Sequence, residues 1–260
     1  MKSKMSLRKI KKYGWIPDVP DGRDHYFMAA PVELPAKVDL TSQCPAKVYD
    51  QGQLGSCTAN AIAGAIEFDL LKQKQSDFTP SRLFIYYNER VIEHTVSEDS
   101  GAMIRDGIKS VNKQGAPHET LWPYKISKFT QKPPAKAFTD ALLHQAVSYQ
   151  RVKQDLGQMK TVLASGYPFV VGFAVYDSFE SEEVARTGTV PMPGQNEQML
   201  GGHAVLCCGY DDSTSRFIFR NSWGPNWGNK GYFTMPYQYL TDTDLSDDFW
   251  VIKIMESPAA

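Results

Sequence analysis

The chain has 260 residues, of which 42% are hydrophobic and 22% are charged, and its formal net charge at pH 7 is −1. A chain of this length can bury a sizeable core in one large domain or in two lobes. The balanced charge argues against nucleic acid or an anionic membrane surface as the main partner, and no apolar stretch is long enough to span a membrane.

The first 32 residues lack the pattern of a core element. Their start is basic without the apolar run of a secretory signal, and two prolines in "GWIPDVPDGRDHYF" forbid a continuous helix. We therefore expect residues 1–32 to form an extended segment, either a short cover over a cleft or a structural strap packed elsewhere. Trp15, Tyr26 and Phe27 favour a packed segment over a discarded tail.

Residues 34–149 show mainly helical patterns, including "SRLFIYYNERVIEH", which Thr79 or Ser81 would cap, and "AKAFTDALLHQAVSY". From about residue 150 the period changes. After one more helical stretch, short β-branched and aromatic runs such as "PFVVGFAVY" and "RFIFRNSW" predict antiparallel strands, with residues 211–215 as a hairpin loop. A helical half followed by a β half predicts an α+β protein with two lobes and a cleft between them.

Four cysteines without paired spacings do not predict a disulfide framework or a zinc site, so we expect mostly free thiols, which suits a reducing compartment. Cys57 has unusual surroundings. It follows Gly-Ser and begins an apolar run with three- and four-residue spacing, which predicts an amphipathic helix with one buried face. A thiol at a helix N-terminus is favoured as thiolate, and the alternative is a buried, inert cysteine.

A nucleophilic cysteine needs a base, and one of the five histidines has a suitable position. His203 follows two glycines and opens the apolar strand "HAVLCCGY". Asn221 ends the next strand, and antiparallel pairing would bring the two side chains together. The alternative for each residue is structural: a satisfied core histidine and an ordinary turn asparagine.

The blocks "QGQLGSC", "GGHAVLCCGY" and "RNSWGPNWGNKGYF", in this order, resemble the three signature blocks of the papain-like cysteine peptidases, which include the cathepsins. The resemblance covers residues 33–255. It implies the papain-like fold, with a helical left lobe over about 40–147 and an antiparallel β-barrel right lobe over about 148–255. Residues 1–32 would then be an N-terminal extension and 256–260 a tail.

The resemblance also implies a role for each catalytic position. Cys57 would be the nucleophile, His203 the general base and acid, and Asn221 the group that orients the imidazole. Gln51, rather than Gln53, would donate to the developing oxyanion, since it has the family's spacing to the cysteine. The resting pair would be thiolate and imidazolium, with the thiol pKa lowered to as little as about 3–4.

Further positions concern the substrate. By resemblance, Gly101 would pair with an extended peptide and Trp223 would shield the His203–Asn221 contact from water. Small residues before His203 would widen the pocket for the second residue upstream of the cleaved bond, and we expect an apolar preference there. The residues expected around this pocket are Ala102, Met103, Gly202 and Ala204.

Departures from the family pattern qualify this interpretation. Leu54 replaces a disulfide cysteine and Thr58 the usual tryptophan, which resembles a bacterial-type branch and argues against a disulfide-stapled extracellular enzyme. We expect a monomeric cysteine endopeptidase acting on proteins or peptides, without cofactor, metal, nucleic acid or membrane insertion. It would be cytoplasmic or exported by a non-classical route. The alternatives are exopeptidase trimming, an idle peptide-binding module on the same fold, and a cysteine-dependent acyltransferase.

Overall fold

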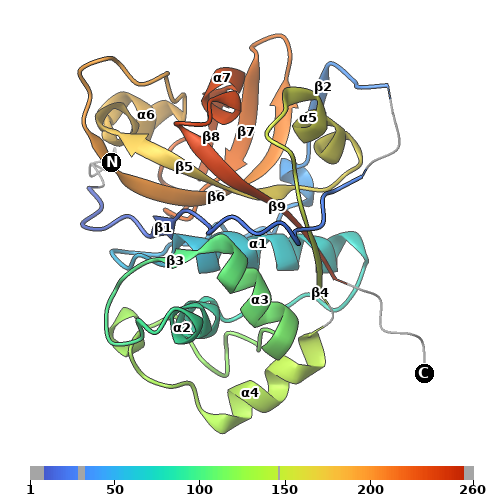
Figure 1. The fold of residues 1–260 in the computed structure, drawn as a ribbon, viewed down its shortest axis with the longest axis vertical. Coiled ribbons are helices and arrows are strands. Elements are labelled where there is room, and N and C mark those ends of the chain that lie inside the picture. Colours follow the sequence, from blue (N-terminus) through green and yellow to red (C-terminus); the bar gives the residue numbers. More distant parts are fainter. Residues whose placement is uncertain (1–8, 29–32, 146, 255–260) are drawn as a thin grey trace, which may run out of the picture.

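The computed structural model describes residues 9–28, 33–145 and 147–254. The basic start of the chain, residues 1–8, and the expected tail 256–260 lie outside the described residues. A helical lobe and a sheet lobe pack against each other, as the sequence predicts for a papain-like protein (Figure 1). Among the described residues, no helix combines the length and apolar character needed to cross a membrane.

The helical lobe follows the predicted pattern. Ser81 is the N-cap of the second helix of this lobe, and its side chain accepts a hydrogen bond from the backbone N–H of Phe84. Of the two caps that the sequence offered, Thr79 and Ser81, the helix therefore uses Ser81. The α-helices of the chain are α1 (Cys57–Lys72), α2 (Arg82–Ile92), α3 (Ile104–Gln114), α4 (Ala135–Ala141), α5 (Leu156–Ala164), α6 (Glu182–Thr187) and α7 (Tyr237–Thr241). Short 3-10 turns are η1 (Thr41–Gln43), η2 (Ile126–Lys128), η3 (Leu142–His144) and η4 (Asp177–Glu180).

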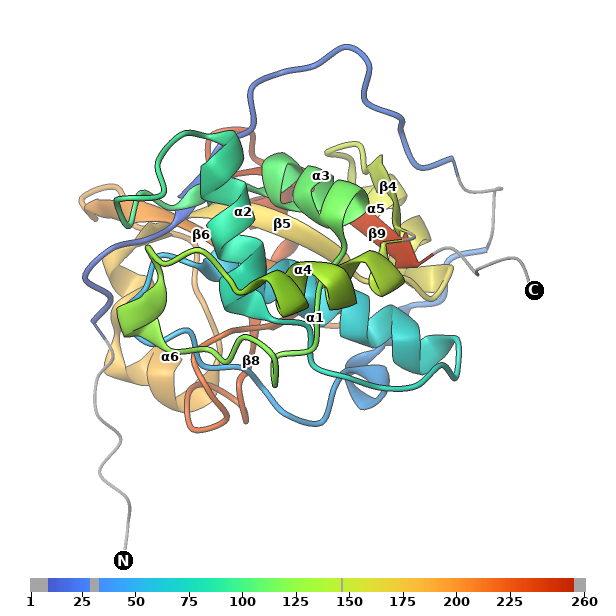
Figure 2. The same ribbon diagram turned by 90° about the horizontal axis from the view of Figure 1, so that it is seen from below.

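The expectation of a single buried face on α1 was wrong. Residues 57–70 are all buried, because α1 contacts α2 and α3 on one side and strands of the sheet on the other. Figure 2 shows α2, α3 and α4 in front of the helix. A helix packed between two layers is surrounded by apolar groups, so its sequence loses the polar stripe of a surface helix.

The sheet lobe is antiparallel, with strand order β4-β9-β5-β6-β7-β8, and β2 also pairs with β6. The predicted hairpin at residues 211–215 is confirmed by the pairing of β6 with β7. Within the described residues the outer strands β4 and β8 do not pair, so the sheet is open and the expected barrel is not closed. The strands are β2 (Lys37–Asp39), β4 (Val147–Arg151), β5 (Phe169–Tyr176), β6 (Met199–Asp211), β7 (Arg216–Arg220), β8 (Tyr232–Pro236) and β9 (Ser246–Ile254).

The prediction of one helix over "AKAFTDALLHQAVSY" also needs correction, because α4 ends at Ala141. The chain enters β4, where Ser148 pairs with Lys253 and Tyr149 with Ile252 of β9. The Tyr149 ring also meets Trp250 edge-on, at 5.9 Å between centroids. This long-range pairing overrides the local helical pattern.

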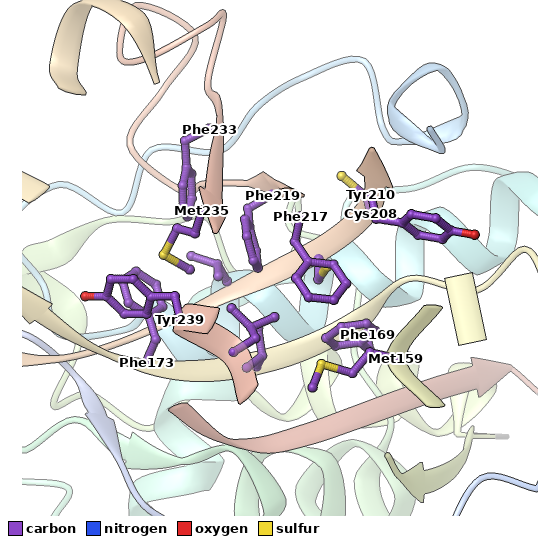
Figure 3. Close-up of a cluster of buried hydrophobic side chains, with 14 of the residues drawn as sticks. Met159, Phe169, Phe173, Cys208, Tyr210, Phe217, Phe219, Phe233, Met235 and Tyr239 are labelled. Atoms are coloured by element: carbon purple, nitrogen blue, oxygen red, sulfur yellow. The ribbon is translucent and has the colours of Figure 1, made fainter. Parts of the chain in front are cut away.

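An aromatic core fixes the strands that carry the candidate catalytic groups (Figure 3). Phe219 of β7 stacks on Phe233 of β8 at 4.9 Å, and Phe169 of β5 meets Phe217 edge-on. Each fully buried ring of this kind contributes about 1.5–3 kcal/mol to folding. The core therefore holds β5, β6 and β7 in one rigid arrangement.

The described part of the N-terminal segment, residues 9–28, is extended, as predicted. Residues 9–28, which we call the strap, run between the two lobes (Figure 1). Within the strap, β1 (Trp15–Ile16) pairs in parallel with β3 (Ala102–Met103), so this segment adds a strand to the helical lobe. The strap therefore lies across the junction at which we expected a cleft.

Candidate active site

Cys57 is the first residue of α1 and is fully buried. Burial raises the pKa of its thiol to about 12, although backbone interactions with Ala204, Gly14 and Thr58 partly oppose this rise. The predicted thiolate is therefore wrong for this state of the protein. The physical reason is burial, to which the strap contributes, because the backbone of Gly14 interacts with the thiol.

His203 and Asn221 come together as the sequence predicts. The pairing of β6 with β7 sets Leu206 opposite Arg220, and the neighbouring ends of the two strands bring the side chains into contact. The distance between His203 Nε2 and Asn221 Oδ1 is 2.8 Å, and both residues are buried. Asn221 Oδ1 also accepts a hydrogen bond from the backbone N–H of Ser222 at 2.8 Å, which fixes the amide orientation.

Gln51 is held in the loop that leads to α1. Its Oε1 accepts a hydrogen bond from Ser222 Oγ at 2.5 Å, and its Nε2 donates to the carbonyl of Leu54 at 3.0 Å. The competing Gln53 is exposed and bonds to the strap instead, through the backbone of Lys9 and Lys11. The structure therefore places Gln51, and not Gln53, next to Ser222, the residue that follows Asn221.

Trp223 lies against His203, with 5.3 Å between ring centroids. Its indole also meets Phe179 and Trp227 edge-on at 5.3 and 5.0 Å. These aromatic rings place apolar surface beside the imidazole. Because they exclude water, the polar contact between His203 and Asn221 is stronger than it would be in solvent.

The arrangement of a helix-terminal cysteine, a strand-borne histidine and an asparagine agrees with the sequence comparisons. Residues 34–248 match the pattern of the papain family of cysteine proteases. The chain belongs to this family.

Individual relatives support the same assignment. An uncharacterized peptidase C1-like protein of Acanthamoeba polyphaga mimivirus is 48% identical over 218 residues, which cover 80% of this chain and 70% of that protein. Xylellain, a cysteine protease from Xylella fastidiosa, has a crystal structure that superposes with a TM-score of 0.91 at 48% identity, over 96% of this chain and 100% of that one. A procathepsin B of Trypanosoma congolense, at 18% identity, shares the fold with a TM-score of 0.72, over 94% of this chain and 87% of that one. This papain-family chain is a cysteine peptidase.

In this papain-family peptidase the backbone of the strap lies against Gly101. The φ angle of Gly101 is +79°, and a Cβ there would overlap the backbone of Gly14. The backbone N–H of Ala102 donates to the carbonyl of Gly14 at 2.8 Å. The edge that was expected to pair with a substrate thus pairs with the strap.

Trp15 fills the space expected for a substrate side chain. A Cβ at Gly202 would lie 2.6 Å from its indole, and a Cβ at Gly172 would overlap the ring. Ala102 and Ala204 are buried close by, and Met103 is half-buried opposite Ile16. The small residues around His203 therefore make room for an indole.

The sequence reasoning missed Asp248, which contacts the same indole. Asp248 is fully buried at the start of β9, with φ +59°. Its Oδ2 accepts hydrogen bonds from Trp15 Nε1 at 3.0 Å and from the backbone N–H of Asp18 at 2.8 Å. The one signal in the sequence was a pair of acidic residues in front of the apolar run "FWVIKI".

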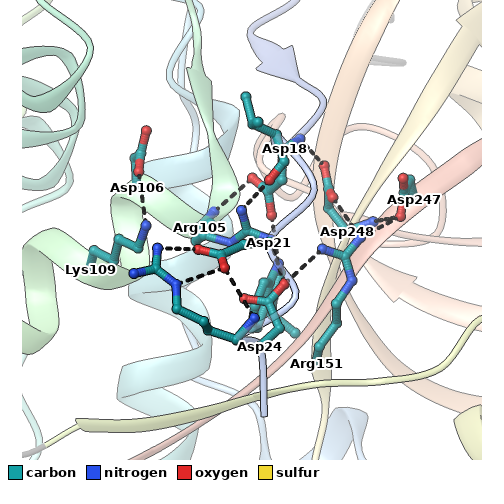
Figure 4. A network of polar contacts seen from close by, with 12 residues as sticks. Asp18, Asp21, Asp24, Arg105, Asp106, Lys109, Arg151, Asp247 and Asp248 are labelled. Carbon is teal, nitrogen blue, oxygen red and sulfur yellow. Dashed lines mark hydrogen bonds and ion pairs between the residues drawn. The ribbon is translucent and has the colours of Figure 1, made fainter. Parts of the chain in front are cut away.

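Asp18, a residue of the strap itself, is the second buried carboxylate of this region (Figure 4). It accepts hydrogen bonds from the backbone N–H of Arg105 at 3.0 Å and from Trp250 Nε1 at 2.9 Å. Burial raises the pKa of Asp18, and its hydrogen bonds with Arg105 and Trp250 oppose this effect. Asp18 therefore joins the strap to the helical lobe through Arg105 and to the sheet through Trp250.

Two arginines hold the strap from opposite sides. Arg105 of α3 forms an ion pair with Asp24 of the strap. Arg151 of β4 lies 3.4 Å from Asp24, 2.7 Å from Asp247 and 3.1 Å from Asp248. This network, drawn in Figure 4, joins the strap to the helical lobe and to the sheet through charged groups that are mostly buried, except Asp247, whose side chain is half exposed.

Proposed function

We propose that this cysteine peptidase uses Cys57 as its nucleophile, His203 as its general base and acid, Asn221 as the group that orients the imidazole, and Gln51 as an oxyanion donor. The observation that carries this proposal is the 2.8 Å contact between His203 Nε2 and Asn221 Oδ1. With Nε2 engaged by Asn221, Nδ1 is the ring nitrogen that exchanges a proton with Cys57.

The proposed reaction has two acyl-transfer steps. The Cys57 sulfur attacks the peptide carbonyl carbon while Gln51 and the backbone N–H of Cys57 stabilise the oxyanion. The amine leaves with the proton from His203, and the acyl group stays on sulfur as a thioester. Water then gives a proton to His203 and attacks the thioester carbon. The carbon–sulfur bond breaks, the carboxylic acid leaves, and the Cys57 sulfur regains the proton from His203.

Titration of the active thiol with an epoxide inhibitor of the papain-like class, read by intact mass, tests these assignments. One adduct on the wild-type chain and none on Cys57→Ala is the expected result. An adduct on Cys57→Ala would assign the reactive thiol to another cysteine and would contradict the proposal.

We also propose that the described form is a closed, self-inhibited state and that residues 1–32 are an extension to a peptidase domain beginning near residue 33. The strap is paired with Ala102, interacts with the Cys57 thiol and sets Tyr13 against His203 at 6.0 Å between ring centroids. Tyr13 is anchored by a 2.6 Å hydrogen bond from its hydroxyl to Glu180. A peptide cannot reach Cys57 until this segment leaves.

The indole of Trp15 supports a proposal for the substrate as well. We expect the opened enzyme to prefer a large apolar side chain with a hydrogen-bond donor, such as tryptophan, at the second position upstream of the cleaved bond. Burying a ring of this size contributes about 1.5–3 kcal/mol, so tryptophan peptides should exceed alanine peptides in kcat/KM by about 10- to 150-fold.

A peptide library assayed on a chain with the strap displaced, such as Gly14→Val, measures this preference. The Asp248→Asn variant is the matched control, because it keeps the shape of the pocket and removes the negative charge near the indole nitrogen. A preference for aspartate or glutamate at this position, or equal rates for alanine and tryptophan, would contradict the proposal.

The pH dependence of strap docking follows from Asp248. Burial, and then the charge of Asp18, raise the pKa of Asp248 to about 7, while the hydrogen bond from the backbone N–H of Asp18 and then Arg151 oppose them. In the docked state the raising effects exceed the opposing ones. They weaken when the strap leaves and water enters, so the docked state binds more protons than the open state. Docking is therefore strongest at low pH and weakens as the pH rises through about 7.

The measurement is the rate of epoxide labelling of wild type divided by that of Asp248→Asn, which cancels the titration of the thiol itself and keeps the effect of Asp248 on docking. We expect this ratio to rise by up to about tenfold between pH 6 and pH 8. A ratio that does not change with pH would show that Asp248 does not control docking. A ratio that falls as the pH rises would show that the sign is wrong.

The monomeric state and the cellular location expected from the sequence stay predictions. Light scattering and cell fractionation test them.

A further inference from the structure

A second cluster of polar side chains lies in the helical lobe, away from the strap. His118 in the loop after α3, Asp140 in α4 and His144 in η3 each offer one ligand atom, and these atoms lie within 4.8 Å of one another. Figure 1 shows α4 at the end of the helical lobe opposite to β1. The proposed peptidase mechanism uses none of these three residues.

An aromatic ring and a backbone hydrogen bond hold the cluster together. The imidazole of His118 stacks on Phe78 at 4.2 Å between centroids, and that of His144 lies on the same ring at 4.4 Å. The centroids of the two imidazoles are 5.3 Å apart. Asp140 Oδ2 accepts a hydrogen bond from the backbone N–H of His118 at 2.9 Å, which fixes the carboxylate beside the first histidine.

The chemistry of the set favours one class of ligand. Two imidazoles and one carboxylate suit zinc and similar divalent transition metals, whereas magnesium and calcium prefer oxygen ligands alone.

We propose that His118, Asp140 and His144 bind one zinc-type divalent ion, with water completing the coordination. Tetrahedral ligands with bonds of about 2.1 Å lie about 3.4 Å apart, so binding draws the three side chains together by short rotations from their present separation. The ion joins the loop at His118 to the α4–η3 segment, which leads into β4. Its role is to stabilise the helical lobe rather than to take part in the peptidase reaction.

Zinc titration of the Cys57→Ala chain by calorimetry tests this proposal, because that substitution removes a competing zinc ligand from the active site. We expect one zinc ion per chain and, at 100 times the Kd, a rise in Tm of about 5–10 °C. Magnesium at the same concentration should leave the Tm unchanged. Cobalt should give the visible absorption of a bound ion with histidine ligands.

The variants Asp140→Asn and His144→Gln, each in the Cys57→Ala chain, should bind zinc at least about tenfold more weakly. Asp140→Asn keeps an oxygen acceptor for the His118 N–H, so its fold is conserved, and the metal-free Tm of each variant checks this. The matched control is His94→Asn, which removes an exposed histidine of the same lobe outside the cluster and should leave the Kd unchanged. No binding to Cys57→Ala, or an unchanged Kd in both cluster variants, would overturn the proposal.

Discussion

Replacing Cys57 with serine or His203 with alanine is expected to lower kcat/KM on a peptide substrate by a factor on the order of 10⁴ or more. Serine keeps the shape of the side chain but its hydroxyl is a far weaker nucleophile, and without the imidazole no group takes the proton from Cys57 or gives it to the leaving amine. The assay is cleavage of a fluorogenic peptide. Every chain in this assay also carries Gly14→Val, so that opening of the strap does not limit the rate.

Cys44→Ala is the control for this prediction, because Cys44 is another buried free thiol that lies outside the proposed site. Its kcat/KM should stay within about twofold of the parent chain. A Cys57→Ser or His203→Ala variant that kept its activity within tenfold would contradict the assignment. If the parent chain bound peptides without cleaving them, the idle binding module would be the better interpretation.

The Gly14→Val substitution is expected to raise the rate at which an epoxide inhibitor labels Cys57 by about 30- to 150-fold. A Cβ on Gly14 would overlap the carbonyl oxygen of Gly55, and the backbone of Gly14 also lies against Gly101. Overpacking of this kind costs about 1–3 kcal/mol. A cost of about 2–3 kcal/mol in the docked state alone multiplies the open population by the stated factor, since each 1.4 kcal/mol is tenfold.

Gly22→Val is the matched control, because it makes the same change in the same segment where a Cβ would have no atom within 4 Å. Its labelling rate should equal that of wild type. The measurement is the second-order rate constant of labelling, followed by intact mass, together with the Tm of each chain. Equal rates for the wild type and Gly14→Val would show that the strap does not control access to Cys57.

Sequence alone determined the family, the two-lobed fold and the candidate catalytic set of Cys57, His203, Asn221 and Gln51. These predictions rest on short-range information. The spacing of apolar residues sets helices and strands, glycines mark the turns, and the hairpin at 211–215 brings the histidine strand beside the asparagine strand. Ser81 could be named as a possible cap for the same reason, because a cap contacts its own helix.

Only the tertiary structure decided the state of the site. Trp15 and Asp248 are separated by 233 positions, and no local pattern couples a residue near one end of the chain to a strand near the other. The same long-range packing buries α1 on all sides and covers Cys57, so its thiol has a raised pKa where a helix N-terminus by itself favours thiolate. Desolvation depends on everything that surrounds a group in space, and the strap supplies a large part of those surroundings only once the chain is folded.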